Sequence, residues 1–142
     1  THLIKITSEV AVGKRDKIII FGNDYPTSDG TAVRDYIHVS DIADIHVKAA
    51  AYLVSNQKSN ILNCGYGKGF SVKEVLEIAN KINDKPIPFE IGNRRTGDSS
   101  MVVSNVSKLK EVLNWQAKHD DLSFIIKTSI NWEKKLLNNN YA

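Results

Sequence analysis

Residues 20–41 read IFGNDYPTSDGTAVRDYIHVSD and pass from an apolar run through a turn-rich stretch into a second extended segment. The β-branched and aromatic run over residues 17–22 predicts a buried strand. Gly, Pro, Asp and Ser dominate residues 23–31, which predicts a loop. Apolar and polar side chains alternate over residues 33–39, so this segment is predicted to be a second strand with Arg34 on its polar side.

Helices and further short strands are predicted along the rest of the chain. Apolar residues recur at helical spacing in 4–12, 41–54, 71–82, 107–113 and a last segment from Asp120 or Asp121 through Trp132. Short apolar runs predict strands over 60–64 and 86–91. Ser40, Ser71 and Ser107 are expected to cap three of the helices, and Glu74 completes a capping box with Ser71. The pattern predicts an α/β fold of mixed short strands and helices.

The composition is that of an ordinary globular protein with one core. The chain has 142 residues, 25% charged and 42% hydrophobic, with a net charge of +3. This charge is too small and too dispersed to indicate nucleic acid, and the sequence has no apolar run of the ~20 residues that a membrane span needs. We therefore expect a single unit over residues 1–142, with a frayed tail over about 138–142, and neither a nucleic-acid nor a membrane partner.

The residues that carry most enzyme chemistry are not arranged in recognisable motifs. The four histidines are scattered and Cys64 stands alone, so no metal site is predicted, and Cys64 is expected to be a core thiol rather than a nucleophile. The turn over 65–69 lies where a dinucleotide fingerprint belongs, but Phe70 replaces its last glycine, which favours a plain tight turn. No tyrosine has a lysine four residues on. The sequence thus predicts no catalytic and no cofactor-binding residue in this chain.

Two features of the sequence could bind an anion. Arg34 is one, and the pair Arg94 and Arg95 is the other, in a loop that also contains Gly97 and Asp98. A guanidinium matches the oxygens of a phosphate, and a nearby glycine lets the backbone approach a ligand. The alternative is that Arg34 pairs with a neighbouring carboxylate while the other two arginines are solvated. Spacing alone favours this alternative, because isolated surface charges are common.

The sequence resembles the UDP-glucose 4-epimerase family of extended short-chain dehydrogenases/reductases. The run over 20–41 is the most specific part of this resemblance. Four further motifs agree with the family in the same order, namely AVGKR at 11–15, N-x-G-Y-G-K-G-F-S-V at 63–72, RRTGD at 94–98 and LNW at 113–115.

The resemblance implies that this chain is the C-terminal substrate-binding portion of such an enzyme. The Rossmann domain, which in the family carries the glycine-rich NAD loop and the tyrosine–lysine pair, is then absent from this chain. NAD is expected to bind to that missing N-terminal domain, and this portion alone is expected to be inactive. The family inverts C4 of UDP-glucose and UDP-galactose through a 4-keto intermediate. The resemblance also implies that the enzyme is cytoplasmic and forms a homodimer.

The resemblance assigns the nucleotide to particular residues. Ile19, Ile20 and Phe21 lie on the strand that receives the uracil in the family. Arg34 and Arg95 are expected to hold the pyrophosphate.

Five further positions follow from the same resemblance. Asp98 is expected to accept a hydrogen bond from the ribose, and Leu3 to offer a backbone amide near the phosphates. His2 stands where some members have Asn, and Tyr36 is expected to line the pocket. Val102 stands where some members have Tyr, and this smaller side chain predicts room for UDP-N-acetylhexosamines.

Two other functions remain open at this point. One is the substrate domain of a different nucleotide-sugar enzyme of the same superfamily, such as a dehydratase or a decarboxylase. The other is a UDP-binding module without catalysis.

Overall fold

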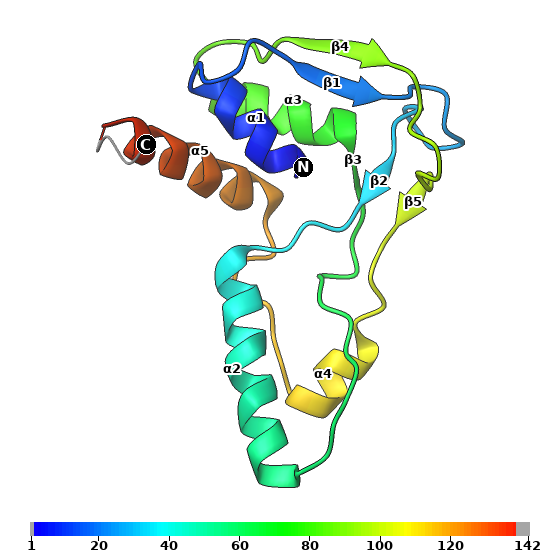
Figure 1. Ribbon diagram of the computed structural model, residues 1–142, viewed down its shortest axis with the longest axis vertical. Coiled ribbons are helices and arrows are strands. Elements are labelled where there is room, and N and C mark those ends of the chain that lie inside the picture. The colour runs from blue at the N-terminus through cyan, green and yellow to red at the C-terminus, as the bar shows by residue number, and fades with distance from the viewer. Residues whose placement is uncertain (1, 139–142) are drawn as a thin grey trace.

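The computed structural model describes residues 2–138 (Figure 1). Its elements are, in chain order, α1 (Leu3–Ala11), β1 (Ile18–Phe21), β2 (Val33–Arg34), α2 (Val39–Asn56), β3 (Phe70–Ser71), α3 (Val72–Ile82), β4 (Phe89–Gly92), β5 (Met101–Val102), α4 (Ser107–Leu113) and α5 (Leu122–Asn138). The predicted α/β class with mixed short strands and helices is confirmed. The predicted fraying over 138–142 falls, apart from Asn138 at the end of α5, outside the described residues.

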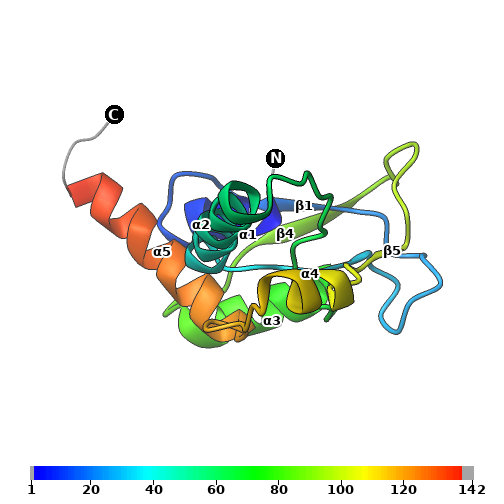
Figure 2. The ribbon, with the colours of Figure 1, turned by 90° about the horizontal axis from the view of Figure 1, so that it is seen from below.

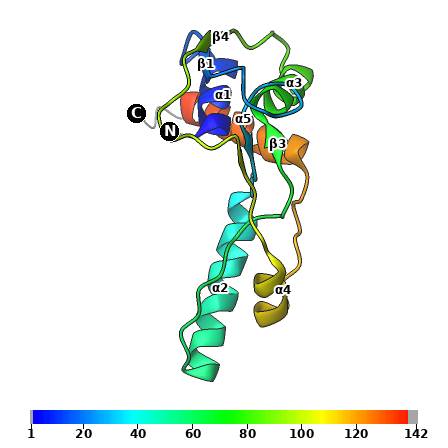
Figure 3. The same cartoon turned by 90° about the vertical axis from the view of Figure 1, so that its right-hand side faces the viewer.

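The molecule has two regions, which Figures 1 and 3 show from two sides. In the first, α1 and α3 both pack against α5, and the strands lie beside them. In the second, α2 and α4 pack against each other and extend away from the first region as an arm. Seen from below, the loops that follow β1 and β4 protrude at one end of the molecule (Figure 2).

The strands form two small sheets. β1 pairs in parallel with β4, from Ile18 opposite Phe89 to Phe21 opposite Gly92. β2 is the middle strand of the other sheet, antiparallel to β3 and parallel to β5, with Arg34 opposite Val102. The pairing of β1 with β4 and of β2 with β5 therefore brings together segments that are distant in sequence.

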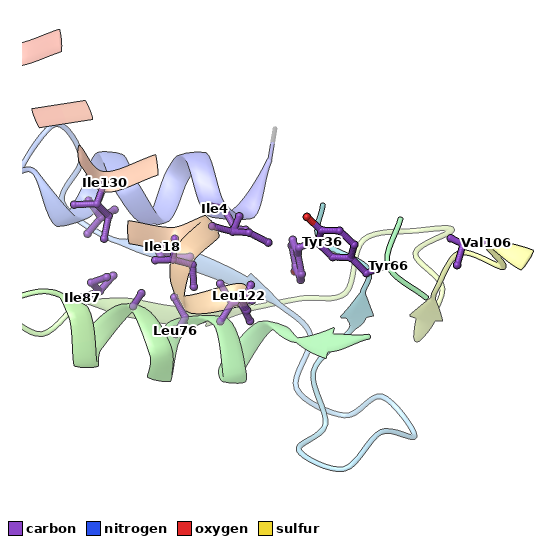
Figure 4. Packing of buried hydrophobic residues seen from close by; sticks show 14 of the residues in the cluster. Ile4, Ile18, Tyr36, Tyr66, Leu76, Ile87, Val106, Leu122 and Ile130 are labelled. Atoms are coloured by element: carbon purple, nitrogen blue, oxygen red, sulfur yellow. The ribbon is translucent and has the colours of Figure 1, made fainter. Parts of the chain in front are cut away.

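One apolar core joins the two regions. Figure 4 shows its members gathered between α1, α3, α5 and β1 and continuing toward the arm; they include Ile4, Ile18, Leu76, Ile87, Leu122, Ile130, Tyr36, Tyr66 and Val106. Burying one such side chain stabilises the fold by about 1.5–3 kcal/mol. Trp115, which is only 2% exposed, is the largest of the fully buried side chains.

The extended segment after β2 differs from the prediction. A strand was expected over 33–39, but β2 comprises only Val33 and Arg34, and α2 already begins at Val39. Past Arg34 the segment has no strand partner, and Tyr36 and His38, from the side predicted to be polar, are the buried side chains. The N-cap is His38 and not Ser40, since the His38 Nδ1 accepts the Ser40 backbone N–H at 3.1 Å.

Three other local predictions are also wrong. Residues 60–64 form no strand, since within residues 2–138 no neighbouring strand pairs with them. Ser107 is the first residue of α4 rather than its cap, and Asn105 Oδ1 accepts its N–H at 3.1 Å. Trp132 is 56% exposed and lies off the apolar face of α5.

The capping box of Ser71 and Glu74 is confirmed. The strand expected over 86–91 is β4, which begins after the two prolines.

Candidate anion-binding site

A cavity of about 350 Å³ opens where the start of α1, the strands β1 and β2, and the loop after β4 meet. Nine of the ten residues that the resemblance indicated line this cavity: His2, Leu3, Ile19, Ile20, Phe21, Arg34, Tyr36, Arg95 and Asp98. They come from four separate segments of the chain. The roles expected of them remain predictions, but the structure brings them to one place.

The tenth residue, Val102, is not part of the cavity lining. It lies on β5 directly opposite Arg34 in the sheet and is 53% exposed. Its place is therefore beside the cavity, on the edge of the second sheet.

Arg34 interacts with a carboxylate that lines the same cavity. Its Nη2 lies 3.6 Å from Asp98 Oδ1, and its Nη1 donates to the carbonyl oxygen of Val33 at 2.8 Å. Pairing of Arg34 with a carboxylate was one of the alternatives, and the structure contains this pair. The contact is long for a charge-assisted hydrogen bond. A diphosphate could therefore replace or share it.

Arg95 lies with its guanidinium carbon 3.7 Å from the centroid of the Phe21 ring. Among residues 2–138 its guanidinium has neither an ion-pair partner nor a hydrogen bond to a side chain. Stacking on an aromatic face leaves the N–H groups at the rim of the guanidinium free to donate. Arg95 thus presents unused donors at the cavity.

Arg94 is bound elsewhere and does not line the cavity. Its Nε donates to Asp24 Oδ1 at 2.6 Å, and its guanidinium carbon lies 4.2 Å from the centroid of the Tyr25 ring. Both arginines are exposed to solvent, as the alternative expected, but they differ in their contacts. Each is stacked on an aromatic ring, and only Arg95 faces the cavity.

The two aromatic side chains at the cavity that can ionise, Tyr36 and His2, are uncharged at neutral pH. Burial raises the pKa of Tyr36 to about 12, although the nearby Arg34 charge acts in the opposite direction. Burial lowers the pKa of His2 below its ordinary value. At neutral pH both groups thus offer neutral hydrogen-bonding atoms, and the positive charge of the cavity comes from its arginines.

Backbone groups add to the site. The N-cap of α1 is His2, whose side chain makes no capping hydrogen bond. The first-turn N–H groups that follow it are suited to an anion. Within the described residues β1 pairs with β4 alone, so the backbone along its other edge has no strand partner.

The turn over 65–67 does not fit a dinucleotide. The backbone N–H groups of Tyr66 and Gly67 donate to the Asp35 carboxylate, at 3.1 and 2.9 Å. These donors would have to face a pyrophosphate in a nucleotide fingerprint, and here they are bound to the chain's own aspartate. The chain bends at residues 65 and 67, and the two backbone N–H groups there are not free for a nucleotide phosphate.

A second polar cluster, which the sequence did not indicate, lies between the two regions of the molecule. Asp41 is fully buried and its Oδ2 accepts from the Tyr66 hydroxyl at 2.7 Å and from the N–H groups of Lys118 and His119 at 3.1 and 3.0 Å. Burial alone would raise the pKa of Asp41, but these hydrogen bonds outweigh it and hold that pKa below its ordinary value. The cluster ties α2 to the segment before α5.

Across residues 2–138, no group of three or more His, Cys, Asp or Glu side chains is arranged to hold a metal ion. The described helices also include none with the length and apolarity needed to cross a membrane.

Comparison with known proteins assigns the chain to a family. The profile of the family described as GDP-mannose 4,6 dehydratase matches residues 1–127. The chain belongs to this family. Among curated proteins, a UDP-glucose 4-epimerase from Azospirillum brasilense is 43% identical over 136 residues, which are 96% of this chain and 39% of that relative.

Solved structures agree with this relationship. A UDP-glucose-4-epimerase from Stenotrophomonas maltophila with bound NAD and formylated UDP-arabinopyranose has a TM-score of 0.92 at 36% identity, over 98% of this chain and 41% of that chain. The UDP-Glc/GlcNAc 4-epimerase from Campylobacter jejuni has a TM-score of 0.84 at 50% identity, over 94% of this chain and 40% of that chain. The predicted resemblance to a C-terminal portion of UDP-glucose 4-epimerases is confirmed. This chain spans about 40% of the length of these relatives.

Proposed function

We propose that this chain is the UDP-sugar-binding portion of an NAD-dependent UDP-glucose/UDP-galactose 4-epimerase. The observation that carries the proposal is the convergence of Arg34 and Arg95, from distant segments, on one cavity beside β1. The names of the relatives support it, since several curated relatives are UDP-glucose 4-epimerases.

The pyrophosphate would lie between the two guanidinium groups. Arg95 has free donors, and Arg34 has only a 3.6 Å contact with Asp98 to give up. Both side chains end in a planar fork that matches two phosphate oxygens at once. The N-terminus of α1, near Leu3, has no side-chain cap, and its first-turn N–H groups would donate to the same phosphates.

The nucleoside would lie along β1. Uracil has alternating donor and acceptor atoms on one edge, and the unpaired edge of a strand offers the same pattern. Ile19, Ile20 and Phe21 line the cavity along this strand. Asp98, once released from Arg34, could accept a hydrogen bond from the ribose, while the neutral phenol of Tyr36 could donate to a phosphate oxygen.

The hexose would extend toward β5. Val102 is half-exposed there and smaller than a tyrosine, so we propose that the site also accepts UDP-N-acetylhexosamines. The C. jejuni relative, named for both UDP-Glc and UDP-GlcNAc, supports this extension.

The redox part of the reaction does not lie with these residues. The sequence has no tyrosine–lysine pair at helical spacing, and the turn over 65–67 is filled by Asp35. We therefore propose that NAD and the acid/base residue belong to another part of the complete polypeptide, and that this chain binds and orients the substrate. We further propose that the complete polypeptide forms a homodimer and is located in the cytoplasm.

The test uses the complete polypeptide that contains these residues, assayed with NAD and UDP-galactose. We expect conversion to UDP-glucose, and we expect Arg95→Ala to raise the KM for UDP-galactose at least ~10-fold, which is the size of one lost charge-assisted contact. The matched control is Arg15→Ala, because Arg15 is paired with Glu9 away from the cavity. Absence of any epimerisation would contradict the proposal.

A second candidate is a nucleotide-sugar dehydratase, which the description of the family profile favours. The same assay separates the two, because a 4,6-dehydration would accumulate a keto sugar rather than the C4 epimer. A UDP-binding module without catalysis would bind UDP and convert neither sugar.

A further inference from the structure

The two consecutive arginines after β4 have different surroundings. Arg95 lies on the Phe21 ring and lines the cavity, whereas Arg94 lies on the Tyr25 ring and does not. Phe21 and Tyr25 stand on either side of the turn at Gly22 that ends β1. The loop after β4 is thus fastened to the loop after β1 at two neighbouring points.

Arg94 binds both the side chain and the backbone of one residue, Asp24. Its Nε donates to Asp24 Oδ1 at 2.6 Å, and its Nη2 donates to the backbone oxygen of the same residue. A guanidinium that holds one residue through both a side-chain and a backbone acceptor fixes its position and its orientation. The Tyr25 ring beneath it is only 5% exposed, so the surface on which it rests is itself held by packing.

Gly22 makes this arrangement possible. Its φ of +86° is favourable only for glycine, and a Cβ there would lie 2.6 Å from the Cγ of Arg94 and 2.8 Å from the Tyr25 ring. Its N–H also donates to the carbonyl oxygen of Gly92 at 2.9 Å, which continues the pairing of β1 with β4. The stem of Arg94 therefore passes directly over the backbone at the end of β1.

We propose that Arg94 is a positioning residue that holds the loop after β4 so that the guanidinium of Arg95 faces the phosphates of a bound nucleoside diphosphate. Arg94 itself does not touch the ligand. The inference rests on the proposed function, since it assigns Arg94 to the same site. It follows that loss of Arg94 weakens chiefly the phosphate contacts of Arg95, and leaves the contacts of the base along β1 unchanged.

The experiment compares UDP with uridine, which lacks phosphates, by titration calorimetry of the complete polypeptide. We expect Arg94→Ala to weaken UDP binding ~10-fold while uridine binding changes less than ~2-fold. Arg94→Lys keeps the charge but loses the fork and the stacking, so we expect it to resemble the alanine variant. Arg15→Ala removes an equally charged, ion-paired side chain elsewhere and should change neither affinity.

A double-variant cycle separates positioning from direct contact. In an Arg95→Ala background, Arg94→Ala should weaken UDP binding by less than ~2-fold further, because the group that it positions is already gone. Additive losses would show that Arg94 acts independently of Arg95 and would overturn the proposal. Equal loss of uridine and UDP affinity in Arg94→Ala would overturn it as well, since the residue would then only support the fold.

Failure of the proposed function has a different signature. If the unaltered polypeptide binds UDP no better than uridine, the diphosphate site itself is wrong. If it prefers UDP and Arg95→Ala removes that preference while Arg94→Ala does not, only the positioning role is wrong.

Discussion

The molecule contains two polar clusters that differ in how deeply their charged groups are buried. Around Asp41, a fully buried carboxylate oxygen accepts three hydrogen bonds, all from the protein. At the cavity, Arg34 and Asp98 have side chains that are 28% and 37% exposed and share one contact of 3.6 Å. Both clusters combine segments that are distant in sequence.

The difference separates a structural cluster from a binding site. Asp41 Oδ2 is bound by three donors and its Oδ1 is buried without a partner, so this carboxylate is closed off from a ligand, and its loss leaves three donors unsatisfied. A partly exposed cation such as Arg34, whose ion contact is 3.6 Å long, contributes little to the fold and is available to an anion. Variants of the first cluster should therefore change stability, and variants of the second should change binding.

The largest expected effect is on stability at Asp41. Asp41→Ala removes the acceptor of a buried hydroxyl and two buried N–H groups, so we expect the free energy of unfolding to fall by about 3–5 kcal/mol. Asp44→Ala on the same helix is the control, since Asp44 makes one contact of 3.3 Å with the exposed Lys118 side chain. Urea denaturation measures both. Equal effects in the two variants would contradict the assignment of a structural cluster.

The next effect is on binding at Arg34. Arg34→Ala should weaken UDP binding about 10–100-fold, the size of a lost charge-assisted contact to phosphate, while the free energy of unfolding changes by less than about 1 kcal/mol. Calorimetric titration and urea denaturation of the same samples give both quantities. If Arg34→Ala lowers the free energy of unfolding strongly but binds UDP normally, Arg34 belongs to the fold rather than to a binding site.

A smaller effect concerns pH and the start of α2. Burial and the nearby His119 charge lower the pKa of His38 below its ordinary value of 6.5, and the Asp41 charge opposes them only in part. The unfolded chain therefore binds this proton more readily than the folded chain. The contribution of His38 to stability is complete above about pH 6.5 and is lost as the pH falls through the folded-state value.

Substitution of His38 tests this pH dependence. His38→Asn keeps an N-cap acceptor but does not titrate, so we expect the unfolding free energy to vary less between pH 7.5 and 5 than in the unaltered chain. His46→Asn, at an exposed position of the same helix, is the control and should keep the original dependence. An unchanged pH profile in His38→Asn would refute the account.

The smallest expected effect is on sugar selectivity at Val102. In the complete polypeptide, Val102→Tyr should lower kcat/KM for UDP-N-acetylglucosamine about 10-fold relative to UDP-glucose, because a larger ring fills the space beside β5. Steady-state kinetics with both sugars give the ratio. If neither the unaltered protein nor the variant turns over the N-acetylated sugar, the proposed tolerance is wrong.

Local signals in the sequence predicted local structure well. The capping box of Ser71 and Glu74 depends only on neighbouring residues, and it is present. Segments 33–39 and 60–64 were predicted less well, because strands require a partner that the local sequence does not reveal. The cap by His38 depends on a ring held by Thr128 of α5, with its Nε2 3.1 Å from Thr128 Oγ1.

The site could be predicted only through the family resemblance. From spacing alone, Arg34 and Arg95 look like separate surface charges, because their convergence depends on how the two sheets meet. Arg94 and Arg95 are adjacent and identical in type, and they differ only in their tertiary contacts, with Tyr25 and Asp24 for Arg94 and with Phe21 for Arg95. The buried cluster of Asp41 was missed for the same reason, since its partners lie far along the chain.

The most direct test is the ratio of the dissociation constants of uridine and UDP for the unaltered complete polypeptide. Two guanidinium groups on one diphosphate should make UDP bind at least ~100-fold more tightly than uridine. Equal affinity for the two ligands would mean that Arg34 and Arg95 do not hold phosphates.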